Sequence, residues 1–554
     1  MLLHKCRFVL LLFFLLGTVT NVDAQGFLKA RGQAIVDGGG RNVLLRGIGL
    51  GGWMLQEGYM LGLTGKWQQQ HEIKKHIEVL LGQQRMEEFY DLWLANHTRK
   101  IDIDSLKAWG FNSVRLPMHY NLFTLPLNEE PVPGQQTWLQ KGFALTDSLL
   151  AWCKANQLYL ILDLHATPGG QGNDLNIADR DSTQPSLWQS EGNQQKMIAL
   201  WQALAKRYAN EEWIGGYDII NEPNWGFQDS LHDTHGLKEK DNGPLRKLMM
   251  ATTAAIRQVD TNHLIIIEGN GWGNNYNGIL PAWDKNMALS FHKYWNYNDQ
   301  QSISQLLKLR EENNMPVWLG ETGENSNVWY TSAIRLLEKN NIGWAWWPLK
   351  KLGANNPLQI KTNHNYQALL SYWNGRRTDP PKESDVYSGL IELAMYTRLE
   401  TNIIHRDVID AMMRQPFSDK ALPFKKHVIS NGAEVEAVDY DLGISGVAYY
   451  DKDSANYRSV SQQRSVGNRG GVYRNDAVDI RKDSSAYERF FVSDIEDGEW
   501  LQYTVDVATP GKYTLELSVA TASDTSRVNI GIVSNMVQQS VLLPATGGAR
   551  SWQT

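Results

Sequence analysis

Cysteine is scarce in this chain of 554 residues, which has only Cys6 and Cys153. Cys6 lies in an N-terminal leader, and removal of that leader would leave Cys153 without a partner. A disulfide framework within the chain is thereby excluded. Cys153 stands in the helical segment "LLAWCKAN", where we expect a buried, small apolar side chain and not a reactive thiol.

Excess charge of one sign is also lacking. The chain has 54 basic and 60 acidic residues, a formal net charge of −6, and no basic tract. This balance argues against nucleic acid and anionic membrane as partners, and we expect a monomer. By contrast, 21 Trp and 22 Tyr are present. Their flat apolar faces stack on sugar rings as well as fill cores.

A long apolar run stands at the N-terminus, in "MLLHKCRFVLLLFFLLGTVTNVDAQG". Basic residues precede it, small residues follow it, and it is too short to span a bilayer comfortably. We therefore expect a signal peptide over residues 1–24, cleaved after Ala24. The mature protein would be secreted, periplasmic or extracellular, without membrane insertion.

The chain up to about residue 350 repeats a short apolar run followed by a segment with helical spacing. Eight such runs occur: "NVLLRGIGL", then residues 111–117, 158–165, 215–223, 263–270, 287–294, 316–323 and 342–349. Several lack alternation, as parallel strands covered on both faces do. Eight strand-and-helix units predict an α/β fold, a (β/α)8 TIM barrel.

Near residue 430 the pattern changes to short alternating segments, "GVAYYD", "AVDIRK", "EWLQYTVDV" and "GKYTLELSVAT". Such segments predict an all-β sandwich, a jelly roll. We expect a catalytic barrel domain over residues 25–425, including closing helices from about residue 380, and a sandwich domain over 433–554. The abrupt ending "SVLLPATGGARSWQT" suggests that the sandwich is truncated at its C-terminus.

Polar residues gather at the ends of the predicted barrel strands, where barrels of this kind place their active sites. They are Arg115, His165, Asn221, Glu222, His292, Tyr294 and Glu321. This set has no pattern typical of a metal site, so we expect neither a metal nor a cofactor in catalysis. Glu222 and Glu321, on the fourth and seventh runs, should face each other across the barrel mouth. Two facing carboxylates are what glycoside hydrolysis requires.

Each of these residues also has a structural interpretation. A glutamate followed by a proline, as in Glu222 with Pro223, often begins a helix. Arg115 is compatible with a structural ion pair and His292 with a core histidine. Their shared position at one end of successive strands favours the catalytic interpretation. Two other glutamates, Glu268 and Glu324, are interpreted as structural.

The environment of the two glutamates would separate their roles. Arg115 should help to keep Glu321 ionised, and Tyr294 should donate a hydrogen bond to it. Glu222 has no such cation in this interpretation, so partial burial and the neighbouring charge should raise its pKa. We expect Asn221 to bind a sugar hydroxyl next to the reacting carbon.

The motifs resemble those of glycoside hydrolase family 5, and within it the exo-β-1,3-glucanase-like members. The stretches that carry the resemblance are "LLRGIGLGGWMLQEG", "NSVRLPMHY", "LILDLHATPGGQGND", "YDIINEPN", "SFHKYW", "WLGETG" and "WWPLK". The resemblance implies a retaining double displacement, with Glu222 as acid/base and Glu321 as nucleophile. It implies substrate contacts from Glu57 in a glycone subsite and from Arg115, His165, Asn221, His292, Tyr294 and Trp347 around the reacting sugar.

Two positions refine this resemblance. One, Trp347, is chosen by its spacing, and the other, Gly49, differs from the family pattern. Trp347 is preferred over Trp346 as the residue beneath the sugar, because its spacing to Lys350 matches a Trp-x-x-Lys pattern of the family. Gly49 stands where related enzymes usually have asparagine.

The C-terminal region resembles a family 6 carbohydrate-binding module in "VEAVDYDLGISGVAYYD", "GVYRNDAVDI" and "DGEWLQYTVDV". Tyr473 matches an aromatic residue of that family's sugar cleft. The cleft's usual tryptophan is replaced by Ala549, and we expect Trp552 in the core. A structural calcium is part of the family pattern, but Val438 replaces one of its glutamates.

The function predicted from these observations is hydrolysis of a polysaccharide, β-glucan, with β-1,3-glucan favoured. The enzyme would be an endo- or exo-acting O-glycosyl hydrolase. The same chemistry on β-1,6-glucan, β-mannan or β-1,4-glucan stays open at this stage. A non-catalytic polysaccharide-binding protein is the alternative from another class.

Overall fold

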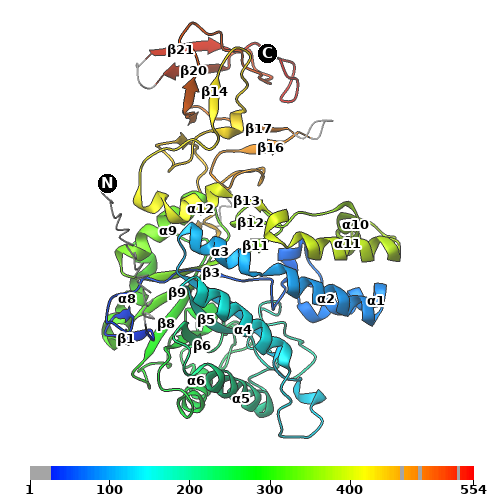
Figure 1. The fold of residues 1–554 in the computed structure, drawn as a ribbon, viewed down its shortest axis with the longest axis vertical. Helices are drawn as coiled ribbons and strands as arrows, with labels where there is room; N and C mark the ends of the chain where they lie inside the picture. The colour runs from blue at the N-terminus through cyan, green and yellow to red at the C-terminus, as the bar shows by residue number, and fades with distance from the viewer. Residues whose placement is uncertain (1–25, 462–466, 484–488, 533–536, 554) are drawn as a thin grey trace, which may run out of the picture.

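The computed structural model describes residues 26–461, 467–483, 489–532 and 537–553. The predicted signal peptide over residues 1–24 lies outside this range. Figure 1 shows a barrel with a group of helices at its side and a strand-rich region at the opposite end of the molecule from α5 and α6.

Eight parallel strands close the barrel in the order β10-β3-β4-β5-β6-β7-β8-β9. They are β3 (Arg46–Gly49), β4 (Ser113–His119), β5 (Tyr159–Ala166), β6 (Ile214–Asp218), β7 (Ile265–Glu268), β8 (Met287–Lys293), β9 (Val317–Gly323) and β10 (Gly343–Trp347). Each falls within or overlaps one of the eight predicted runs. The predicted (β/α)8 fold is therefore confirmed, and the continuous apolar runs are explained by burial on both faces.

Helices cover the outside of the barrel between the strands (Figure 1). They are α3 (Lys100–Trp109), α4 (Gln140–Ala155), α5 (Glu191–Tyr208), α6 (Gly243–Arg257), α8 (Ser304–Asn313) and α9 (Asn327–Lys339), with a single turn α7 (Asn270–Gly273) after β7. In α5 the Ser190 side chain accepts from the Asn193 N–H, which caps the helix. Met197, Trp201 and Leu204 then recur on the buried face. Cys153 is fully buried in α4, as predicted.

A separate helical group stands at the side of the barrel (Figure 1). It consists of α1 (Gln70–Leu81), α2 (Gln83–His97), α10 (His364–Trp373) and α11 (Glu383–Tyr396), which share their own apolar cluster. Of the helices predicted to close the barrel, α12 (Arg406–Met413) packs against α9. By contrast, α11 joins the side group.

Short strand pairs form the region after residue 426. β14 (His427–Ile429) pairs with β19 (Val505–Val507), β15 (Tyr449–Tyr450) with β18 (Trp500–Leu501), β16 (Ile480–Lys482) with β17 (Phe490–Val492), and β20 (Arg527–Ile532) with β21 (Val537–Leu542). Their apolar core includes Val438, Tyr440, Tyr449 and Ile480. The predicted all-β C-terminal region is thus confirmed. Small sheets β1–β2 (Lys29–Arg31, Ala34–Val36) and β11–β12–β13 (Lys350–Lys351, Leu358–Gln359, Ile403–Ile404) complete the described strands.

Two sequence predictions for this region are wrong. "GKYTLELSVAT" forms no strand apart from a single bridge at Val519. Tyr513 and Leu515 are 46% and 65% exposed, because no described strand pairs with their segment to bury one face. Trp552, expected in the core, is 41% exposed and meets Phe491 edge to face. In the described part of the chain, no helix combines the length and apolarity that crossing a membrane demands.

Candidate active site

The barrel places the predicted site residues at the same end. Arg115 lies in β4, His165 in β5, His292 in β8 and Glu321 in β9, while Asn221 and Glu222 follow β6, Tyr294 follows β8, and Trp347 ends β10. All are buried except Tyr294, which is partly buried. Parallel strands of a barrel end on one face, and this brings together residues that are far apart in the sequence.

Arg115 is the hub of the site. Its guanidinium donates to Glu321 at 2.9 Å, to Asp218 at 2.9 and 3.0 Å, to the Asn221 Oδ1 at 2.8 Å and to Glu268 at 3.1 Å. Burial disfavours the charge, but the surrounding carboxylates outweigh burial and raise the pKa of Arg115 well above its usual value. The side chain therefore stays cationic and orients several site residues at once.

Glu321 receives two hydrogen bonds. The Tyr294 hydroxyl donates to its Oε1 at 2.8 Å, and Arg115 donates to its Oε2. Burial and the charge of Glu321 raise the pKa of Tyr294 well above its usual value, so Tyr294 remains a donor. Each of the two carboxylate oxygens of Glu321 is therefore held by a hydrogen-bond donor.

Glu222 has a different environment. Its Oε1 lies 2.6 Å from the His292 Nδ1, and its backbone N–H donates to Glu268 at 2.7 Å. Burial raises the pKa of Glu222, His292 opposes this, and Glu321 and Glu268 reinforce it, so that the net shift is upward. The backbone φ of Glu222 is +42°, a region that non-glycine residues adopt at a cost and that is common at functional sites.

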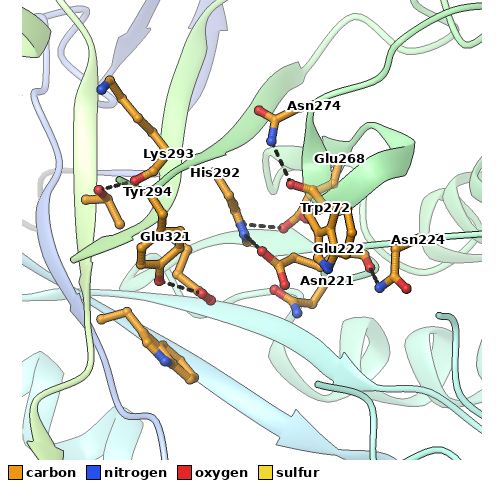
Figure 2. Close-up of polar contacts among 12 residues, drawn as sticks. Asn221, Glu222, Asn224, Glu268, Trp272, Asn274, His292, Lys293, Tyr294 and Glu321 are labelled. Carbon is orange, nitrogen blue, oxygen red and sulfur yellow. Dashed lines mark hydrogen bonds and ion pairs between the residues drawn. The ribbon is translucent and has the colours of Figure 1, made fainter. Parts of the chain in front are cut away.

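His292 bridges two glutamates. Dashed lines in Figure 2 join it to Glu222 and to Glu268. Its Nε2 lies 3.2 Å from the Glu268 Oε1. Burial lowers the pKa of His292, but Glu268, Glu222 and Glu321 outweigh burial and raise it well above its usual value. Glu268, interpreted from the sequence as structural, thus contacts Arg115, His292 and the backbone of Glu222. Glu324, the other such glutamate, pairs with Lys351 at 2.5 Å.

The two predicted catalytic glutamates lie close together. One oxygen of Glu222, one of Glu321 and one ring nitrogen of His292 all lie within 4.8 Å of one another. The three groups are therefore spaced so that they could hold a cation. The raised pKa of His292 means that a proton competes with a metal ion for its nitrogen.

The remaining predicted substrate contacts are His165, Trp347 and Glu57. Trp347 stacks beside His165, with ring centroids 5.1 Å apart, and its Nε1 donates to the Tyr59 hydroxyl at 3.1 Å. Trp346 instead packs edge to face on Tyr330 in the core. Glu57 accepts from Asn176 at 3.0 Å, and burial together with the charge of Glu321 raises its pKa well above the usual value.

Sequence reasoning missed two aspartates at the base of the site. Asp163 lies 2.7 Å from the His165 Nδ1 and 3.3 Å from Arg115, and Asp218 accepts from Arg115. Burial and the charge of Glu268 raise the pKa of Asp218 well above its usual value. Asp163 stands two residues before His165, so the two side chains share one face of the strand. This spacing is the sequence signal from which Asp163 could have been predicted.

The side chain of Tyr473, in the C-terminal region, is partly buried. Its ring lies 4.8 Å from that of Phe490, and its hydroxyl donates to Asp439. Val438, which replaces a glutamate of the family 6 pattern, is buried in the apolar core of the region and offers no metal ligand.

Comparisons with known proteins agree with this geometry. Residues 70–353, about half of the chain, match the model described as "Cellulase (glycosyl hydrolase family 5)". Residues 474–554 match "Carbohydrate binding module (family 35)". The module found is thus of the family 35 type, and the family 6 assignment made from the sequence is not supported.

Three curated relatives are similar to the chain. A "Beta-xylosidase" from Phanerodontia chrysosporium is 26% identical over 383 residues, covering 62% of this chain and 75% of the relative. "Endoglucanase C" from Acetivibrio thermocellus is 23% identical, covering 45% and 83%. A "Glucan 1,3-beta-glucosidase" from Candida oleophila is 28% identical, covering 33% and 43%. With the barrel, the paired glutamates and the family match together, the chain belongs to glycosyl hydrolase family 5 and is a glycosidase.

Proposed function

We propose that this protein hydrolyses β-glucan with retention of configuration, with Glu321 as nucleophile and Glu222 as acid/base. The observation that carries the proposal is the approach of the two side chains, whose nearest oxygens lie within 4.8 Å. Carboxyl groups about 5 Å apart suit retention, whereas inversion needs roughly 6.5–9.5 Å to admit a water.

The contacts support this division of roles. Arg115 and Tyr294 donate to Glu321, which suits a carboxylate that attacks the sugar carbon. The raised pKa of Glu222 suits a group that first protonates the leaving oxygen and then deprotonates a water. Asn221, Glu57, His165 and Trp347 would hold the sugar. The chemistry needs no cofactor.

The preferred substrate is β-1,3-glucan, on the strength of the sequence resemblance and of the relative named as a glucan 1,3-beta-glucosidase. The relatives named as an endoglucanase and a beta-xylosidase make β-1,4-glucan and β-xylosides the next candidates, ahead of β-1,6-glucan and β-mannan. We also propose that the N-terminal segment directs export, that the enzyme acts on extracellular polysaccharide, and that it is a monomer. The domains would be a catalytic barrel over residues 25–425 and a sugar-binding module over 433–554.

A direct test follows the anomeric configuration of the product. The purified protein is incubated with laminarin, pustulan, glucomannan, carboxymethylcellulose and xylan, and the first product is observed by proton NMR. We expect laminarin to be cleaved fastest and the β-anomer to form first. Glu321→Ala and Glu321→Gln should abolish turnover while the protein stays folded. A first-formed α-anomer, or turnover by the Glu321 variants equal to that of the parent, would refute the mechanism.

A further inference from the structure

The C-terminal region and the barrel meet along a buried polar seam. The Asn327 side chain, at the start of α9, donates to Asp407 of α12 and to Asp476, both at 2.9 Å. The Asn475 backbone N–H donates to the same Asp407 carboxylate at 2.7 Å, and its side chain donates to the Asn325 carbonyl at 2.8 Å. Asn327, Asp407 and Asp476 are at most 1% exposed. Separation would leave these groups unpaired, which is costly, so the seam holds the two parts together.

One segment from the C-terminal side of this seam contacts the loops that follow β8 and β9. We call residues 454–461 the rim segment. Its Ser454 carbonyl accepts from Ser326 at 2.5 Å, and Asn456 exchanges two hydrogen bonds with Asn325, at 2.8 and 2.9 Å. Ala455 is 1% exposed and belongs to the main apolar cluster of the barrel. The rim segment is therefore fixed on the loop that follows β9, the strand of Glu321.

The same segment also holds the loop that follows β8. The Ser459 backbone N–H donates to the Trp295 carbonyl at 3.1 Å, and the Ser459 hydroxyl donates to the Tyr294 carbonyl at 3.3 Å. The Arg458 guanidinium lies 3.5 Å from the centroid of the Trp295 ring, within the range of a cation–π contact. These contacts hold Trp295 and the backbone carbonyl of Tyr294. The hydroxyl of Tyr294 is the group that donates to Glu321.

Trp295 needs such support. Its φ is +49°, a left-handed conformation that is a genuine outlier for a bulky residue. Strain of this kind persists only where surrounding contacts impose it. Besides the rim segment, the Glu324 carbonyl accepts from the Trp295 Nε1 at 3.1 Å. Loss of the rim contacts would let residues 294–296 relax and would move the Tyr294 hydroxyl.

We infer that the rim segment positions Tyr294 and Glu321 for the reaction, so that the C-terminal region takes part in turnover as well as in any attachment to polysaccharide. Arg458, Asn456 and Ser459 are positioning residues in this inference, which rests on the proposed function of Glu321. A region that only attached the enzyme to a polymer would leave the hydrolysis of a small soluble glycoside unaffected.

The test compares Arg458→Ala with Arg481→Ala in the full chain. Arg458 is exposed, so its truncation leaves no cavity, and Arg481 is an exposed arginine of the same region that pairs with Asp494. We expect Arg458→Ala to lower kcat on a soluble aryl β-glycoside about tenfold, as small misplacements of reacting groups do. KM, the melting temperature and retention on insoluble glucan should stay unchanged, and Arg481→Ala should match the parent throughout.

Hydrogen–deuterium exchange gives a second measurement that needs no activity. Peptides covering residues 287–297 should exchange faster in Arg458→Ala and in Asn475→Ala than in the parent or in Arg481→Ala. Parental kcat together with parental exchange in Arg458→Ala would overturn the inference. If the parent protein cleaves no glycoside, the proposed function fails, and the exchange result alone then decides whether the rim segment holds this loop.

Discussion

The His292 ring lies between Glu222 and Glu268, with its Nδ1 2.6 Å from one carboxylate and its Nε2 3.2 Å from the other. Only Glu222 of the two faces the predicted nucleophile, whereas Glu268 is fully buried. Burial lowers the pKa of His292, but the carboxylates of Glu268 and Glu222 outweigh burial and raise it, which favours the imidazolium form. The charge on Glu268 is the largest of the contributions that raise the pKa of His292. Glu268 therefore influences Glu222 through the His292 ring that contacts both.

The first prediction concerns Glu268→Gln. Loss of the carboxylate should lower the pKa of His292, because the largest charge contribution that raises it is removed. It should also weaken the hydrogen bond from the Glu222 backbone and lower kcat/KM about 10- to 100-fold. Titration of labelled histidine by NMR and steady-state kinetics measure the two effects. The surface variant Glu312→Gln is the matched control, and an unchanged His292 titration in Glu268→Gln would contradict this account.

The second prediction concerns the pH profile. The pKa of Glu222 is raised, so its acid form persists above the usual range for glutamate and is lost as the pH rises further. We therefore expect kcat/KM to fall on the alkaline side of the optimum. Glu222→Gln has no titrating group there and should lose that alkaline limb, measured on aryl glycosides whose leaving groups need no proton. An alkaline limb that persists unchanged in Glu222→Gln would assign it to another residue.

The third prediction concerns Gly49, which lies against the Trp347 ring. A Cβ at this position would lie 2.7 Å from the Trp347 Cε3 and 3.1 Å from its Cζ3, closer than such contacts occur. Gly49→Ala should therefore displace the Trp347 ring and raise KM, in the same direction as Trp347→Ala. Gly511→Ala, with no neighbour within 4 Å, is the control. Parental KM in Gly49→Ala would show that the ring has room to move.

The fourth prediction concerns Lys350, which follows Trp347 in the Trp-x-x-Lys pattern. Its Nζ lies 2.6 Å from Asp102 and donates to the carbonyls of His97 and Thr397, with both side chains fully buried. Lys350→Met would leave Asp102 buried without its cation, which should reduce the free energy of unfolding by about 3–5 kcal/mol. Urea denaturation measures the loss, and the exposed Lys308→Met should be neutral. A double variant that also replaces Asp102 with leucine should recover much of the stability, and failure to recover would implicate the lysine in packing.

Much of the fold could be predicted from the sequence because its signals are local. Each barrel strand lies in an apolar run of the sequence. Arg115 and Glu321 lie within two of these strands, and Glu222 follows a third. The barrel topology then brings these residues together without further information. The preference for Trp347 over Trp346 came instead from the family resemblance and its Trp-x-x-Lys spacing, and the structure places Trp346 in the core.

What the sequence did not reveal depends on contacts between distant segments. Glu268 ends a strand just as Glu222 follows one, and only the position of His292 distinguishes a glutamate inside the site from one outside it. The segment containing Tyr513 alternates as a strand should, yet a strand needs a partner, and alternation does not identify one. The contact of Arg458 with Trp295 joins residues far apart in the sequence, so no local pattern predicts it.

The buried seam also limits how the parts of this chain can be exchanged. A module on a flexible linker can be lost or replaced by recombination with little effect on its enzyme. Here a foreign module would leave Asn327 and Asp407 facing a surface without the complementary groups of Asn475 and Asp476, at a cost of about 1–3 kcal/mol for each unpaired group. Barrel and module are therefore matched to each other at this seam, and we expect substitutions on one side to limit those that the other side can accept.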